Sequence, residues 1–343
     1  MKTVSTSPRI LKALFQTSLA SVTMLLCALI GALLSGSLTS CDHKELDRLS
    51  ASCARVRVLF DWRKAPGASA KGMSLYLYPQ TGGDPLRYDF PNASGGTVEI
   101  PFGRYRALFL NNDSETLLLR GTERFASFEL YTRTSTLLEP LGLQGNPEGA
   151  NPPDEPVVLA PDALWAGQED PVELSLSDLR ADPTVGDADK EITLYPQGKT
   201  CTYTVEIRRV QNLKYTSALS FSLSGLSGNL FAGRGERSSL RSTIPFPAKA
   251  DGAAEKVTAR FLCFGTSTSA NPLRTLSLYV ILSDGSKQYY TFDVSAQVNE
   301  APDPKNVHIL IEGLNLPKPI VNGGGGFHPT VDEWQNITEE IDM

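Results

Sequence analysis

The apolar and polar positions alternate with a period of two along most of the chain. Residues 73–78 (MSLYLY) and 219–223 (LSFSL) are typical, because each is strand-length and is followed closely by Gly or Pro. No segment of ten or more residues shows a convincing period of 3.6, although residues 174–179 or 215–219 would support a helical turn. Many short strands joined by turns predict an all-β chain of antiparallel β-sandwiches, with one face of each sheet exposed to water.

Changes in composition divide the chain. Alternation stops in a stretch rich in Gly, Pro and Asn and resumes some thirty residues later. We therefore expect an N-terminal β-sandwich over residues 54–160, a linker region over 161–190 and a C-terminal β-sandwich over 191–316. Residues 317–343 form a Gly-rich connector and an acidic tail, which is either an exposed extended segment or a strand that adds to a sheet edge.

The N-terminus differs from the rest of the chain. Lys2, Arg9 and Lys12 precede an apolar run over residues 22–34, and no acidic residue appears before Asp42. This order is typical of a secretory signal peptide, and the run is short for a membrane span, which needs roughly 20 predominantly apolar residues. An uncleaved N-terminal anchor is the alternative.

The apolar run ends in Leu38-Thr39-Ser40-Cys41, which resembles a bacterial lipobox. We therefore expect residues 1–40 to be a cleaved lipoprotein signal peptide, Cys41 to be the lipidated first residue, and residues 41–53 to be a tether. Acyl chains contribute roughly 0.8 kcal/mol per buried methylene, so two or three hold a protein on a membrane. The predicted location is the outer membrane, with the protein lipid-anchored and facing the cell surface.

The net charge of the chain that follows the predicted signal peptide limits which class of partner it can bind. The signal peptide holds three of the 32 Lys and Arg residues and none of the 38 Asp and Glu residues, which leaves 29 basic against 38 acidic side chains, a net charge of −9. Nucleic-acid binding needs a basic footprint, so we expect no nucleic acid as a partner.

Three cysteines follow Cys41. Cys201 and Cys263 share the parity of the apolar positions in their segments, so both should face a core. They form either a disulfide in an oxidising envelope or two buried free thiols. Cys53 shares the parity of two arginines, which predicts an outward position.

Candidate chemistry is sparse. The histidines, His43, His308 and His328, have no spacing that suggests a metal or a catalytic site, and no nucleotide-binding or hydrolase motif is present. Three acidic residues in the predicted linker region fit no complete Ca²⁺ loop and are better read as a solvated loop; they are Asp182, Asp187 and Asp189. We expect a non-enzymatic protein without a cofactor or a bound metal.

Aromatic residues offer one further possibility, since exposed rings stack on sugars. Trp62 and one of the adjacent Tyr289 and Tyr290 should belong to cores, because adjacent strand positions face opposite sides. Trp165 and Trp334 lie in predicted loops, where they would form a sugar platform.

Several long phrases carry a resemblance. They are "CDHKEL" at 41–46, "VLFDWRKAP" at 58–66, "MSLYLYP" at 73–79, "SGLSGNLFAGRGE" at 224–236, "YYTFDVSAQV" at 289–298, "APDPKNVHILIEGLNLP" at 301–317 and "GGGFHPTVDEWQNI" at 324–337. They resemble a family of Bacteroidales envelope lipoproteins of unassigned function, similar to fimbrillin-like and fimbrial-anchor (minor fimbrium accessory) proteins. The resemblance implies two tandem transthyretin-like β-sandwich domains and a role in fimbriae or surface adhesion.

The resemblance also implies a way of assembling. Fimbrial subunits join by strand addition, in which an extended segment of one subunit pairs with a sheet edge of another. A polymerising subunit loses its N-terminal strand to a protease at Arg or Lys, and Arg48, Arg55 and Arg57 offer such positions. We expect an anchor or accessory component of a fimbria-like adhesin, or alternatively a glycan- or host-protein-binding outer-membrane lipoprotein.

Overall fold

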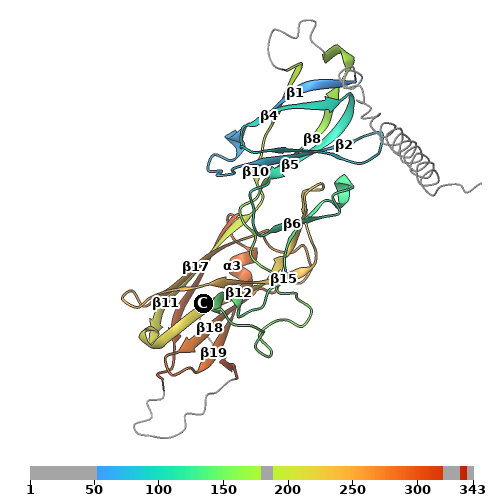
Figure 1. Cartoon of the computed structure of the whole chain (residues 1–343). Helices are drawn as coiled ribbons and strands as arrows, with labels where there is room; N and C mark the ends of the chain where they lie inside the picture. The colour runs from blue at the N-terminus through green and yellow to red at the C-terminus, as the bar shows by residue number, and fades with distance from the viewer. Residues whose placement is uncertain (1–51, 179–187, 320–332, 338–343) are drawn as a thin grey trace, which may run out of the picture. The chain divides into compact units, whose positions relative to one another are not determined.

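The computed structural model describes residues 52–178, 188–319 and 333–337, and its regular elements are almost all β-strands (Figure 1). The all-β prediction is confirmed. The first sheet has the order β4 (Gly95–Pro101), β1 (Cys53–Phe60) and β9 (Lys190–Leu194). The second sheet has the order β10 (Gln197–Gly198), β8 (Trp165–Leu174), β5 (Gly103–Asn111), β2 (Met73–Pro79) and β3 (Leu86–Phe90).

Three more sheets follow. The third has the order β14 (Glu236–Arg237), β13 (Asn229–Phe231), β7 (Glu129–Thr132) and β6 (Leu117–Arg120). The fourth has the order β16 (Lys249–Asp251), β17 (Lys256–Cys263), β11 (Cys201–Gln211) and β20 (Asn306–Asn315). The fifth has the order β15 (Arg241–Pro247), β12 (Thr216–Ser227), β18 (Thr275–Leu282), β19 (Lys287–Asp293) and β21 (Gln335–Ile337).

Helical elements in the described part of the chain are short. They are α3 (Ser295–Asn299) and the 3₁₀ turns η1 (Trp62–Lys64), η2 (Phe125–Ser127), η3 (Glu139–Leu141), η4 (Leu176–Asp178) and η5 (Leu213–Tyr215). No helix within the described ranges is long and apolar enough to cross a membrane.

The first core lies between the first and second sheets, which form two layers in Figure 1. Alternate residues of β1 face this core, and Val56 and Val58 are fully buried while Arg55 and Arg57 are exposed. Removing these apolar side chains from water supplies roughly 25 cal/mol per Å² of stabilisation. The period of two therefore determines which side of β1 is buried.

Strand β2 is buried on both faces. Leu75 and Leu77 point into the first core, whereas Tyr76 and Tyr78 pack with Phe128 and its neighbours in a second, smaller cluster. This cluster includes residues of the third sheet. The sequence MSLYLYP accordingly shows apolar or aromatic side chains at nearly every position.

The largest core lies between the fourth and fifth sheets. Phe221, Phe246 and Phe261 stack in sequence, with ring centroids 5.7 Å and 3.9 Å apart. Strands β11 and β20 run parallel, and β11 and β17 run antiparallel. Long strands of alternating pattern therefore build a sandwich, as the sequence predicts, but its sheets are mixed rather than purely antiparallel.

The predicted linker over residues 161–190 is corrected by the structure. It contains β8, which pairs with β5 across most of its length, and residues 190–194 form β9 beside β1. Polar residues in the middle of β8, Gln168 to Asp170, hide the alternation because this part of the strand is largely exposed. Backbone pairing holds β8 in the sheet, and Gly167 admits the Phe109 ring, which lies 2.5 Å from where a Cβ would stand.

The number of domains stays a prediction. The third sheet takes β6 and β7 from before the expected linker and β13 and β14 from after it, and Ala54–Met343 group as one compact unit. The predicted signal peptide, Cys41 and most of the tether lie outside the described residues, as does most of the Gly-rich connector.

Candidate interaction sites

The N-terminal strand β1 carries two of the predicted protease positions. Arg55 and Arg57 are exposed on the outer face, while Arg48 lies outside the described residues, as does Cys41. The β1 backbone has β9 on one side and β4 on the other. The N–H of Arg55 also donates to Asp189 Oδ2 at 2.8 Å. Both arginines therefore belong to the middle strand of a sheet.

Cys201 and Cys263 lie directly opposite each other on β11 and β17. Both are buried, as the parity predicts, and both are free thiols. Burial raises the pKa of each thiol, so both stay protonated at neutral pH. Cys53 is half-buried at the start of β1 rather than fully outside.

The predicted chemistry-bearing residues do not converge. His308 lies on the outer face of the fourth sheet, with its Nε2 3.6 Å from Glu206 Oε2. Asp189 binds the β1 backbone, and Asp182, Asp187, His43 and His328 fall outside the described part of the chain. No group of three potential metal ligands occurs among the residues described.

The aromatic residues are packed rather than free. Trp165 begins β8 instead of lying in a loop, and its ring meets Trp62 edge to face at 6.2 Å. Trp334 meets Tyr279 edge to face at 5.7 Å. Tyr289 and Tyr290 are both buried, at 2 % and 1 % exposure, because both faces of β19 are covered. The expectation that only one of the two tyrosines is buried was wrong.

The tail supplies a strand to a sheet edge. Strand β21 runs parallel to β19, with Gln335, Asn336 and Ile337 opposite Gln288, Tyr289 and Tyr290. Ile337 packs against the largest core, and Trp334 packs against the cluster that contains Tyr279. For these residues the second of the two predicted alternatives is the correct one.

Two other edges of the sandwich built from the fourth and fifth sheets, at β15 and β20, are covered by contacts within the fold, whereas β16 is a short exposed edge strand. On β15 the N–H of Thr243 points away from β12 and donates to Pro156 O at 3.0 Å, and Pro245 and Pro247 share its parity but have no N–H. On β20 the side chain of Gln297 exchanges two hydrogen bonds with the backbone of Leu310, at 2.7 and 2.9 Å. The β19 edge differs because a short tail strand covers it.

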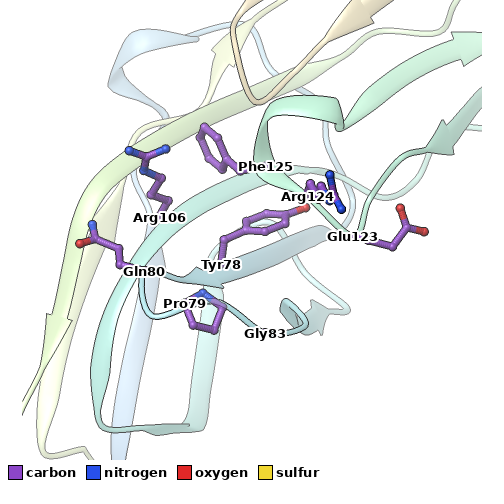
Figure 2. A pocket seen from close by; sticks show the side chains of 8 residues that line it. All are labelled: Tyr78, Pro79, Gln80, Gly83, Arg106, Glu123, Arg124 and Phe125. Atoms are coloured by element: carbon purple, nitrogen blue, oxygen red, sulfur yellow. The ribbon is translucent and has the colours of Figure 1, made fainter.

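A pocket of about 460 Å³ opens where β2 ends (Figure 2). Its lining combines aromatic, amide and charged side chains: Tyr78, Pro79, Gln80, Gly83, Arg106, Glu123, Arg124 and Phe125. Figure 2 shows the Tyr78 and Phe125 rings close together, with Gln80 and Arg106 on one side and Glu123 and Arg124 on the other. The sequence interpretation missed this site, because Tyr78 and Phe125 belong to ordinary strand-like alternation.

Hydrogen bonds fix the walls of the pocket. The Tyr78 hydroxyl donates to Thr122 O at 2.7 Å, and burial raises the pKa of that hydroxyl, which keeps it a donor. The two aromatic rings meet edge to face at 5.5 Å, and the Arg106 guanidinium lies 5.7 Å from the centre of the Phe125 ring. Two neighbouring Tyr residues on one face of MSLYLYP are the signal that this face is covered.

Comparisons with known proteins agree with this architecture. The chain is 25% identical over 331 residues to the "Putative fimbrium anchoring subunit Fim4B" of Bacteroides ovatus, covering 87% of this chain and 92% of that protein. It resembles the crystal structure of a putative adhesin from Bacteroides ovatus, with a TM-score of 0.56, 23% identity and coverage of 82% of this chain and 99% of that one.

The fimbrial anchor protein Mfa2 of Porphyromonas gingivalis matches with a TM-score of 0.45 and 14% identity over 76% of this chain and 91% of that one. A family model described as a domain of unknown function, DUF5119, matches residues 40–247. Because that match spans more than half of the 343 residues, this chain belongs to the DUF5119 family.

Proposed function

We propose that the chain is a non-enzymatic lipoprotein, attached through Cys41 to the outer membrane and facing the cell surface, that anchors a fimbria-like adhesin or serves as its accessory component. The name of the Bacteroides ovatus relative, a fimbrium anchoring subunit, supports this role.

The observation that carries the proposal is the position of β1. A polymerising subunit would lose this strand by cleavage at Arg or Lys. Here Val56 and Val58 are fully buried, and the strand lies between β4 and β9. A protease needs an extended backbone free of sheet pairing, so cleavage after Arg55 or Arg57 would require β1 to leave the core first. A chain that keeps β1 and is also uncleaved at Arg48, upstream of β1, stays joined to its lipid.

Partners would add at the β19 edge. Its neighbour β21 has three residues, so its removal sacrifices few backbone hydrogen bonds compared with the long strands of the same sandwich. A strand from a fimbrial subunit would gain those backbone bonds and the contacts of Trp334 and Ile337. This would join the polymer to a protein that the membrane holds.

The test replaces Cys41 by Ala in the native envelope. The expected result is loss of the protein from the outer-membrane fraction and release of filaments into the medium. Cys53→Ser is the matched control, because it removes a thiol twelve residues downstream without touching the predicted lipid site. Unchanged membrane retention of the Cys41→Ala protein would overturn the proposed anchoring.

A further inference from the structure

The pocket in Figure 2 has the make-up of a ligand site, and the anchoring role does not use it. Its volume of about 460 Å³ falls in the range of roughly 300–1,000 Å³ that is usual for small-molecule sites. The pocket is open to solvent. An open pocket suits one unit of a longer molecule better than a small free ligand that the protein would have to surround.

The charges of the pocket cancel. Arg106 Nε lies 2.9 Å from Asp170 Oδ2, so this guanidinium already has a carboxylate partner. Glu123 stands beside Arg124 in the chain and on the same side of the pocket. With two arginines and two carboxylates, the pocket has no net positive charge. It therefore does not favour a phosphate, a sulfate or an acidic sugar as its ligand.

The hydrogen-bonding groups that line the pocket are planar. The amide of Gln80, the two guanidinium groups and the Glu123 carboxylate each present neighbouring polar atoms in one plane. Such groups bind two adjacent hydroxyl groups at once. The partly exposed ring of Phe125 adds an apolar wall for the C–H face of a sugar ring, and the buried Tyr78 ring supports it edge to face.

These groups are held in place before any ligand arrives. One carboxylate, Asp170, accepts a hydrogen bond from Gln80 Nε2 at 2.9 Å and also holds Arg106. Tyr78 is fixed through Thr122 O. A site whose walls are fixed loses little conformational entropy when it binds.

We propose that this pocket binds a neutral sugar unit of a glycan, with Gln80 and Arg106 on its hydroxyl groups and Phe125 against its ring. The site is separate from Trp165 and Trp334, which pack against other aromatic rings. It gives the chain a binding activity beyond anchoring, and it does not depend on the lipid or on fimbrial subunits.

The experiment uses the purified mature chain and saturation-transfer NMR with the methyl glycosides of glucose, galactose, mannose and N-acetylglucosamine, and with N-acetylneuraminic acid as the charged comparison. At least one neutral glycoside should bind with a dissociation constant in the millimolar range, more tightly than the charged sugar. Gln80→Ala should weaken binding about tenfold, which corresponds to the loss of one or two hydrogen bonds. Gln80 is exposed, so this variant should keep its unfolding temperature.

Phe125→Ala should abolish binding. Arg104→Ala is the matched control, because Arg104 is an exposed arginine on β5 outside the pocket lining. Three results would overturn the proposal: no binding of any neutral glycoside, binding that Gln80→Ala and Phe125→Ala leave unchanged, or binding lost only in Trp165→Ala or Trp334→Ala. Each of them would leave membrane retention through Cys41 untouched, so failure here is distinct from failure of the anchoring role.

Discussion

Single carboxylates tie strands together at two depths. The buried Glu155 accepts hydrogen bonds from Arg241 Nε at 2.6 Å, the Gly225 N–H at 2.8 Å and Thr243 Oγ1 at 3.2 Å, which joins the loop before Pro156 to the fifth sheet. On the outer face of the fourth sheet, Glu206 is bound by Arg208 Nε at 2.7 Å and Lys256 Nζ at 2.8 Å. The contribution of Glu206 and its two partners to stability can be tested by measuring how unfolding depends on pH.

Hydrogen bonds from Arg208 and then from Lys256 lower the pKa of Glu206 from its ordinary 4.5 to about 2. Because the folded pKa lies below the unfolded one, the stabilisation is complete above about pH 4.5 and disappears as the pH falls towards 2. Glu206→Gln should therefore lower the unfolding temperature at pH 6 and leave it unchanged near pH 2. Thermal unfolding followed by circular dichroism across this range checks the prediction, with the exposed Glu173→Gln as control; an equal shift at every pH would contradict it.

At the scale of elements, alternating apolar and polar positions predict a strand where one face of that strand is exposed to water. The prediction fails where a run of polar residues interrupts the alternation. Residues 257–263 form a strand as expected, with buried positions alternating with more exposed ones, but β8 contains the exposed run Gln168 to Asp170 and was predicted to be a linker. Its position follows from pairing with β5, a long-range contact that no local pattern contains. The pocket was missed for the same reason, since its aromatic wall forms only when the segment around Phe125 meets the end of β2.

The tail strand β21 gives an element-scale prediction. Ile337 holds the strand against the largest core, so Ile337→Asp should detach it, because burying a carboxylate without a partner is unfavourable. Amide exchange of Tyr289 and Tyr290 should then accelerate at least about tenfold, measured by hydrogen–deuterium exchange of the peptides spanning β19. Asn336→Asp is the control, since Asn336 is exposed in the same strand. Equal exchange in wild type and Ile337→Asp would show that the tail does not protect the edge.

At the scale of the molecule, the chain buries two large apolar cores and leaves its N-terminal strand in the middle of a sheet. In the proposed anchor, this strand is the link between the folded part and residue 41. The proposed lipid attachment is at Cys41, upstream of the described residues, and it is inferred from the sequence.

The most direct measurement is mass spectrometry of the intact protein from its native envelope, read at the N-terminus. The account predicts a mature chain that begins at Cys41 and carries acyl groups on that residue. An unlipidated chain that begins after Arg48, Arg55 or Arg57 would contradict it, because such a chain would be a processed, polymerising subunit and not an anchor.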